Sequence, residues 1–116
     1  MNRNNIVLCG SNSYEKKYYL DDNFAGLPQS IQDELKIMCV LYTEDIGGIL
    51  TLEFEEDGTL VFEVDADEGD LLFDEIGSVL KVKQLQADKR ELLESLELYY
   101  KVFYLHEDAT KLLEDQ

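Results

Sequence analysis

The most regular pattern of the chain lies between residues 50 and 65, where apolar and polar side chains alternate. The apolar positions form two runs of three: Leu50, Leu52 and Phe54, then Leu60, Phe62 and Val64. This period of two predicts two half-buried strands. A two-residue Asp57-Gly58 turn would place the two runs on opposite faces, whereas a three-residue loop over 56–58 places all six on one face. The sequence therefore predicts a hairpin closed by Glu56 to Gly58, with Gly58 in the left-handed conformation.

A helical pattern begins at Pro28, a residue that suits the first helical position because its missing N–H would be unpaired there. The apolar residues that recur at helical spacing are Ile31, Leu35, Met38 and Tyr42. Further apolar residues at 37–41 predict a helix that is buried on nearly all sides. An alternative ends the helix near Lys36 and makes 37–43 a strand. Gly47 and Gly48 end the helix in either case.

The N-terminal segment combines an apolar run, residues 6–9, with a turn-rich stretch at 10–13 and three tyrosines within 14–20. Tyrosine favours strands, so strand–turn–strand is the first interpretation. A short helix over 14–20, capped by Ser13, is the alternative.

Two further helices are predicted in the C-terminal half. Residues 71–85 carry a stripe of apolar side chains, although Gly77 in its middle weakens the helix. That stripe consists of Leu72, Ile76, Val79 and Leu80. Asp88, with Glu91 three residues later, resembles a capping box and predicts the start of the last helix.

The element order is therefore ββ-α-ββ-α-α. This order predicts an α+β fold, a two-layer sandwich in which an antiparallel sheet has its helices packed on one face. The length of 116 residues, without repeats or a linker, predicts one domain over 1–116. The ends, 1–4 and 107–116, are expected to be frayed.

Charge narrows the functional classes. The chain has 26 acidic and 10 basic residues, and residues 49–75 hold 11 acidic and no basic ones. Such a balance argues against nucleic acid or an anionic membrane as a direct partner. No apolar run is long enough for a membrane span and no secretory signal is visible, which predicts a cytoplasmic protein.

The acidic segment has two interpretations. It is either a solvated outer face of the sheet or a docking face for a basic protein partner, with electrostatically steered association. The candidate interaction residues are Glu53, Glu55, Glu63, Asp65, Asp67, Glu68 and Asp70.

The last helix carries a second interaction signal. Its three apolar stripes between Leu92 and Leu105 exceed what one face against a sheet can bury. Either other parts of the chain cover them or a second copy does. The favoured prediction is a homodimer formed by the stripe of Leu93, Tyr100 and Tyr104.

Residues that could carry catalysis or hold a metal are few. The segment beginning at Asp65 fails as a calcium loop, because glycine falls at loop position 5 and Ile76 at position 12. His106 is the only histidine, and Cys9 and Cys39 are expected to be buried, unreactive thiols. No metal, cofactor or catalytic residue is predicted, and the chain is not expected to be an enzyme.

Several segments together resemble a domain-of-unknown-function family of short acidic proteins from clostridia-like bacteria. They are residues 8–10, 14–19, 42–49, 74–78 and 97–101. The resemblance implies a bacterial cytoplasmic protein and carries no activity with it. In size, charge and element types the chain is also similar to the small acidic chaperones of type III secretion, which are α+β dimers.

The sequence as a whole favours a non-enzymatic, acidic protein-interaction module, either an adaptor or a chaperone-like protein. Two alternatives remain. One is a small-ligand-binding or enzymatic domain with a pocket between sheet and helices, near Cys9 and Gly47-Gly48. The other is a nucleic-acid mimic that presents its carboxylates in place of phosphates.

Overall fold

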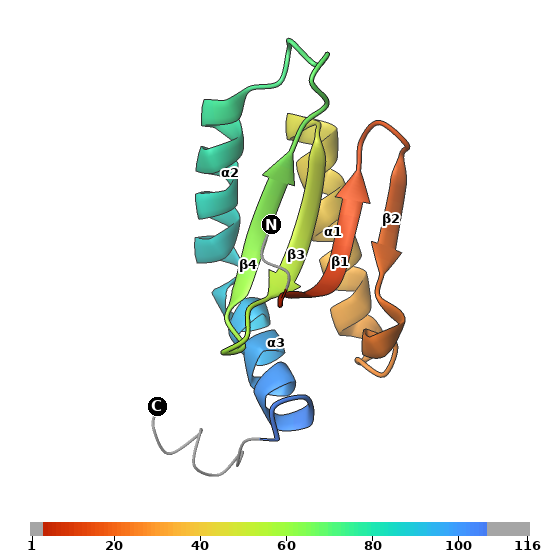
Figure 1. Cartoon of the computed structure of the whole chain (residues 1–116), viewed down its shortest axis with the longest axis vertical. Helices are drawn as coiled ribbons and strands as arrows, with labels where there is room; N and C mark the ends of the chain where they lie inside the picture. Colours follow the sequence, from red (N-terminus) through yellow and green to blue (C-terminus); the bar gives the residue numbers. More distant parts are fainter. Residues whose placement is uncertain (1–3, 107–116) are drawn as a thin grey trace.

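The computed structural model of the protein describes residues 4–106. One antiparallel sheet of four strands, in the order β2-β1-β3-β4, forms the centre of these residues (Figure 1). The strands are β1 Ile6–Asn12, β2 Lys17–Leu20, β3 Ile49–Phe54 and β4 Leu60–Asp65. A 3-10 helix, η1 Asp22–Phe24, and the helix α1 Gln29–Ile46 lie between β2 and β3 in the chain. The helices α2 Glu75–Asp88 and α3 Arg90–Phe103 follow β4.

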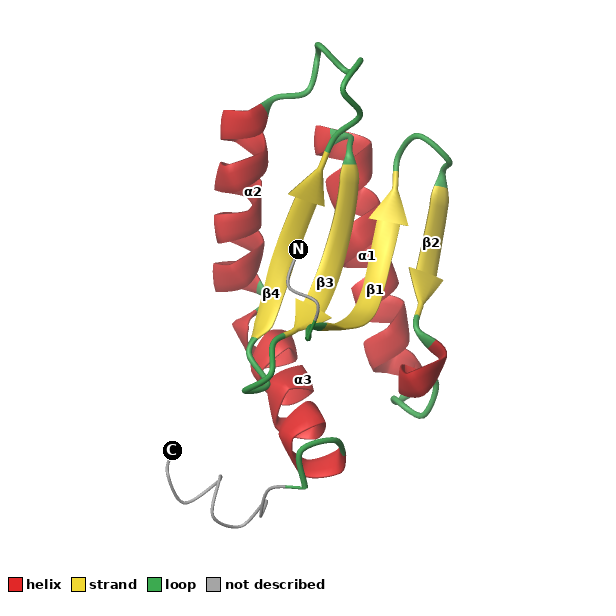
Figure 2. Cartoon of the chain, viewed as in Figure 1, coloured by secondary structure: helices red, strands yellow, loops and turns green. Residues whose placement is uncertain are grey.

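This arrangement confirms the predicted α+β fold and its ββ-α-ββ-α-α order. In Figure 2, α1 crosses behind the sheet, and α2 stands beside β4 at the far edge from β2. The main contacts of α2 are with α1 and α3, whereas α1 and α3 also pack on strands. The position of α2 at the margin of the helical layer decides which of its faces is covered.

The β3–β4 hairpin has the predicted register. Phe54 pairs with Leu60 and Leu52 pairs with Phe62, so the apolar residues of both strands share one face. Gly58 has φ +93° and donates its N–H to the Glu55 carbonyl, which closes the turn. The three-residue loop is therefore confirmed, with its left-handed residue at Gly58.

The N-terminal hairpin confirms strand–turn–strand, but its turn lies later than residues 10–13. β1 continues to Asn12, whose side chain accepts hydrogen bonds from the backbone N–H groups of Tyr14 and Glu15. Gly10 stays in the strand because the ring of Tyr19 lies over it, and a Cβ there would approach that ring to 2.8 Å. Ser11 stays because its hydroxyl bonds to Thr43 on α1 at 2.7 Å.

Residues 37–43 are helical, as the first interpretation predicted. α1 is continuous from Gln29 to Ile46, with Pro28 as its N-cap. Gly47 and Gly48 follow with φ of +86° and +70°, which an L side chain rarely adopts. The helix therefore turns directly into β3.

The core lies between the sheet and the helices and contains a cluster of aromatic rings. Phe54 of β3 stacks on Tyr100 of α3 with ring centroids 4.3 Å apart. Phe24 of η1 lies 5.6 Å from Phe54 and 5.1 Å from Tyr104. The Tyr104 hydroxyl donates to the Asn23 carbonyl. These contacts fix α3 against the sheet and η1.

The boundaries predicted for the last two helices are wrong. α2 begins at Glu75, because Asp74 is its N-cap and accepts the N–H of Gly77 at 2.9 Å. Gly77 suits this site, since a Cβ there would collide with the Asp74 carboxylate. Asp88 is the last residue of α2 and does not cap α3, whose N-cap Lys89 makes no side-chain capping bond. The two helices are thus nearly continuous.

Candidate functional site

The structure divides the predicted acidic docking residues into different environments. Glu53 is only 3% exposed, and its carboxylate accepts a hydrogen bond from the Asn5 side chain at 3.1 Å. The N-terminal segment that precedes β1 therefore covers Glu53. Its carboxylate contributes nothing to an exposed face, which corrects the place assigned to it from the sequence.

The other predicted docking residues are accessible to different degrees. Glu63, Asp65, Asp67 and Glu68 are exposed, whereas Glu55 and Asp70 are half-buried. Asp70 accepts a hydrogen bond from the Tyr14 hydroxyl at 2.6 Å, and this bond raises the pKa of Tyr14. The same hydroxyl accepts the backbone N–H of Asp67. Tyr14 thus ties the acidic loop over 66–74 to the β1–β2 turn.

The stripe predicted to form a dimer lies largely in the protein's own core. Leu93 and Tyr100 are 9% and 5% exposed, and Tyr104 is half-buried against Phe24. The sequence allowed this stripe to be covered either by other parts of the chain or by a second copy, and in the structure other parts of the chain cover it. The observation that favoured a dimer through these residues is therefore explained within one chain.

α2 has the opposite arrangement, because its apolar stripe faces outward. The helix turns Ser78, Val82 and Leu85 toward the rest of the protein, at spacings of four and three residues. The large apolar residues on and just before the helix are instead exposed, from 54% at Val79 to 95% at Leu72. We call this surface the α2 ridge: Leu71, Leu72, Ile76, Val79 and Leu80. The stripe that predicted this helix from the sequence is therefore exposed and not packed against the rest of the protein.

A groove of about 480 Å³ runs between α1 and α2. Its lining includes Met38, Tyr42 and Leu85, with the exposed Ile37 and Leu41 beside them. Lys81 and Lys89 lie at its margin, where they pair with Asp45 at 3.7 Å and Glu34 at 3.5 Å. The groove adds a second exposed apolar surface on the helical side of the protein.

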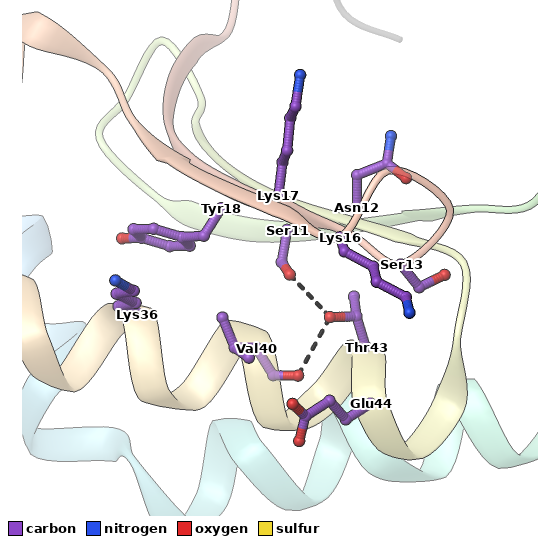
Figure 3. A pocket seen from close by; sticks show the side chains of 10 residues that line it. All are labelled: Ser11, Asn12, Ser13, Lys16, Lys17, Tyr18, Lys36, Val40, Thr43 and Glu44. Atoms are coloured by element: carbon purple, nitrogen blue, oxygen red, sulfur yellow. Dashed lines mark hydrogen bonds between the residues drawn. The ribbon is translucent and has the colours of Figure 1, made fainter.

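A second cavity, of about 600 Å³, lies between the β1–β2 hairpin and α1 (Figure 3). Its floor contains the hydrogen-bonded hydroxyls of Ser11 and Thr43, and in Figure 3 the ring of Tyr18 lies above Lys36, to one side of Val40. Three lysines line it: Lys16, Lys17 and Lys36. They are the only basic residues between residues 4 and 80. We call this cavity the hairpin pocket.

Besides the Ser11 and Thr43 hydroxyls, which bond to each other, the hairpin pocket contains polar groups without a partner in the described residues. None of the three lysines has an ion pair within the described residues. The Tyr18 hydroxyl is buried without a hydrogen-bond partner in the same part of the chain. Burial raises the pKa of Tyr18, so this hydroxyl stays protonated and can donate. The pocket is therefore rich in donors.

The two cysteines lie deeper, between β1 and α1. Both are fully buried, and their sulfurs are 3.9 Å apart in a weak hydrogen bond. That hydrogen bond and burial raise the pKa of the Cys39 thiol above its ordinary value, so this thiol stays protonated. The expectation of buried thiols is confirmed.

Neither a metal site nor a membrane span is found in residues 4–106. Their His, Cys, Asp and Glu side chains form no group of three or more that could hold a metal ion. No helix among them combines the length and the apolar character needed to cross a membrane.

The sequence did not predict the α2 ridge, and it predicted a pocket between sheet and helices near Cys9 and Gly47-Gly48, none of which lines the hairpin pocket. A signal for the pocket was present, since all three basic residues of a long acidic stretch belong to it. A signal for the ridge was present only in part. Residues 76–85 carry apolar side chains on two sides of the helix, and periodicity does not say which side the chain covers.

Comparison with known proteins identifies a family. The model of a family of unknown function, DUF6145, matches residues 5–108, and the chain belongs to that family. No curated protein and no solved structure matches the chain.

Proposed function

We propose that this member of DUF6145 is a non-enzymatic protein-interaction module, adaptor or chaperone-like, that binds a basic amphipathic segment of another protein on the α2 ridge. The exposure of that ridge carries the proposal. Leu72, Ile76 and Leu80 are 95%, 76% and 62% exposed. Large apolar side chains exposed on one helix and on the loop that leads into it favour an interaction site.

Burial of the ridge supplies a driving force. Covering a fully exposed leucine or isoleucine side chain contributes roughly 1.5–3 kcal/mol. The ridge offers five large apolar side chains, and the α1–α2 groove adds Ile37 and Leu41. The groove is lined by none of the ridge residues, but its apolar walls can accept one large side chain of a partner as an anchor.

Charge selects the partner. The exposed carboxylates nearest in sequence to the ridge are Asp67, Glu68, Asp74 and Glu75, and residues 49–75 contain no lysine or arginine. Figure 1 shows the loop that carries the first two leading into the start of α2. A helix with one apolar stripe and lysine or arginine beside it complements this surface, in the helix-in-groove mode of recognition.

A fluorescently labelled helical peptide of leucine and lysine tests the proposal by anisotropy, at low and at physiological salt. The apolar variant is Leu72→Ser with Leu80→Ser, and the acidic variant is Asp67→Asn with Glu68→Gln. We expect the apolar variant to weaken binding at both salt concentrations. The acidic variant should weaken binding mainly at low salt, where surface charge is least screened.

The matched control is Glu91→Gln with Glu94→Gln, which removes the same charge from the exposed face of α3. Equal weakening by this control would show an attraction to net charge alone and would contradict a defined surface. Unchanged binding by the apolar variant would move the proposal to the nucleic-acid mimic, which needs carboxylates only. A wild-type dimer in light scattering that the apolar variant dissociates would show that a second copy occupies the ridge.

A further inference from the structure

The hairpin pocket is separate from the α2 ridge and is chemically its opposite. The ridge is apolar with carboxylates beside it, whereas the pocket combines lysines with hydroxyl groups. Its volume of about 600 Å³ lies within the range of small-molecule sites in proteins. Two walls are apolar, the ring of Tyr18 and the side chain of Val40 (Figure 3).

The placement of cations in this chain is uneven. Elsewhere in the described residues, Lys81 and Lys89 are paired with carboxylates, whereas Lys83, Arg90 and Lys101 have no ion pair but lie far along the chain from the pocket, on α2 and α3. Lys16, Lys17 and Lys36 have no such partner, although the chain carries 26 acidic residues. Figure 3 shows the side chains of two of them, Lys16 and Lys36, along the cavity, and two unpaired ammonium groups there favour an anion as its occupant, even in a protein with net charge −16.

The two ends of the pocket differ. Figure 3 shows the Tyr18 hydroxyl and Lys36 at one end, and Lys16 at the other, near Thr43 and Glu44. The Glu44 carboxylate opposes an anion at its own end. The other end contains the unpaired ammonium of Lys36 and the buried hydroxyl of Tyr18, which has no hydrogen-bond partner in the described residues, and no carboxylate is among the lining residues there. The Lys36 end is thus the better place for a negative group.

We infer that the hairpin pocket binds a small organic phosphate, with the phosphate at the Lys36 and Tyr18 end and the organic part between the Tyr18 ring and Val40. Lysine binds phosphate as a point charge, and a hydrogen bond between charged groups is about twice as strong as a neutral one. Lys16 and the hydroxyls of Ser11 and Thr43 lie toward the opposite end of the pocket, where they face the far end of the organic part. The net negative charge of the protein acts against this binding only weakly at physiological salt, where the screening length is about 8 Å.

Phenyl phosphate is the probe, titrated into the full chain at physiological salt and followed by the backbone amide signals of Ser11 and Thr43 in two-dimensional NMR. Benzyl alcohol and benzoate are the neutral and the carboxylate probes. We expect phenyl phosphate to shift the pocket signals and to bind more tightly than either. Benzoate that binds as tightly as phenyl phosphate would overturn the assignment to phosphate, and a silent pocket would overturn the site.

Three neutralising variants rank the lysines. Lys36→Gln should weaken phenyl phosphate binding about tenfold, as expected for the loss of a charge-assisted hydrogen bond. Lys16→Gln should weaken it less. Lys17→Gln is the matched control, because it removes the same charge from the adjacent residue, whose side chain points away from α1 in Figure 3. Equal effects of all three would show attraction to general positive charge and would contradict the pocket.

Tyr18→Phe separates binding from folding. The variant keeps the ring and removes only a buried hydroxyl that has no partner in the described residues. Because an unpaired buried polar group is costly, we expect the ligand-free variant to melt at the same or a higher temperature. It should nevertheless bind phenyl phosphate more weakly than the wild type. Wild-type affinity in this variant would show that the hydroxyl does not reach the ligand and would overturn the proposed orientation.

Discussion

α2 and α3 are neighbouring helices of equal length, 14 residues each. Most large apolar side chains of α3 are buried, whereas those of α2 are largely exposed. α3 buries three leucines and a tyrosine against the sheet and η1. The one fully buried residue of α2 is Ser78. α3 faces a layer of aromatic and aliphatic side chains, whereas α2 contacts the margins of two other helices. An apolar helical stripe therefore identifies a surface that must be covered, but not what covers it.

The largest expected difference between the helices comes from one substitution made in each. Leu96→Ala in α3 removes a side chain that is 1% exposed and should lower the free energy of unfolding by about 3 kcal/mol. Leu80→Ala in α2 truncates a side chain that is 62% exposed, and we expect a change below about 0.5 kcal/mol. Urea denaturation followed by circular dichroism measures both.

The pair is matched in chemistry, so burial is the main variable. A loss above about 1.5 kcal/mol for Leu80→Ala would mean that the α2 ridge is covered in solution. Repeating the measurement over a range of protein concentrations would then reveal whether a second copy covers it, because the stability of a dimer rises with concentration.

Much of the fold was predictable because local chemistry fixed it. The alternation at 50–64 together with Gly58 allowed only one loop length that kept six apolar side chains on one face. Features that depend on distant segments were not predictable. The alternation in its strand predicts that Glu53 faces outward, but the structure buries it under Asn5, which lies 48 positions away in the sequence. Asn12 reads as part of a turn, yet it ends a strand and caps the turn that follows.

The candidate sites show the same limit. Charge counting predicted an acidic surface but could not place it next to the α2 ridge, because that needs the position of α2 beside α1 and α3. The hairpin pocket unites Lys16 and Lys36, which are 20 residues apart in sequence and meet only through the packing of the hairpin on α1. A sequence pattern identifies the apolar or charged face of a single helix or strand. These sites form where the faces of different elements meet.

The next largest effect is expected at the start of the helices, because α2 has a side-chain cap and α3 has none. Asp74→Ala removes the side chain that caps α2 and should cost about 1 kcal/mol, the usual worth of such a cap. Because α2 has little tertiary packing, we expect the loss as faster amide hydrogen exchange in its first turns, with α3 amides unchanged. Asp74→Asn keeps a capping oxygen and is the control. Uniform loss of protection in both helices would show that they unfold as one unit.

A smaller difference between the two helices is expected in how the stability of the protein depends on alkaline pH. Burial raises the pKa of Tyr100 in α3 above its ordinary value near 10. The stabilisation from the protonated hydroxyl is therefore complete below about pH 10 and is lost as pH rises through the raised pKa. Urea midpoints measured on either side of pH 10 should fall with pH, and less so in Tyr100→Phe. Leu80→Tyr places a tyrosine on the exposed ridge and should add no pH dependence, so a steeper fall there would contradict its exposure.

The smallest effect concerns what holds α2 in place. Lys81 pairs with Asp45 of α1 at 3.7 Å, but the Asp45 side chain is 63% exposed, and exposed ion pairs contribute from nothing to about 1 kcal/mol. We expect Lys81→Gln to lower the free energy of unfolding by less than about 0.5 kcal/mol, and the difference to vanish at high salt. Lys83→Gln is the control on the same helix, since Lys83 has no ion pair within the described residues. A larger loss for Lys81→Gln would mean that charge positions α2. The expected small loss leaves Val82 and Leu85 as its anchors, so that the helix stays in place by one narrow face and keeps the α2 ridge free for a partner.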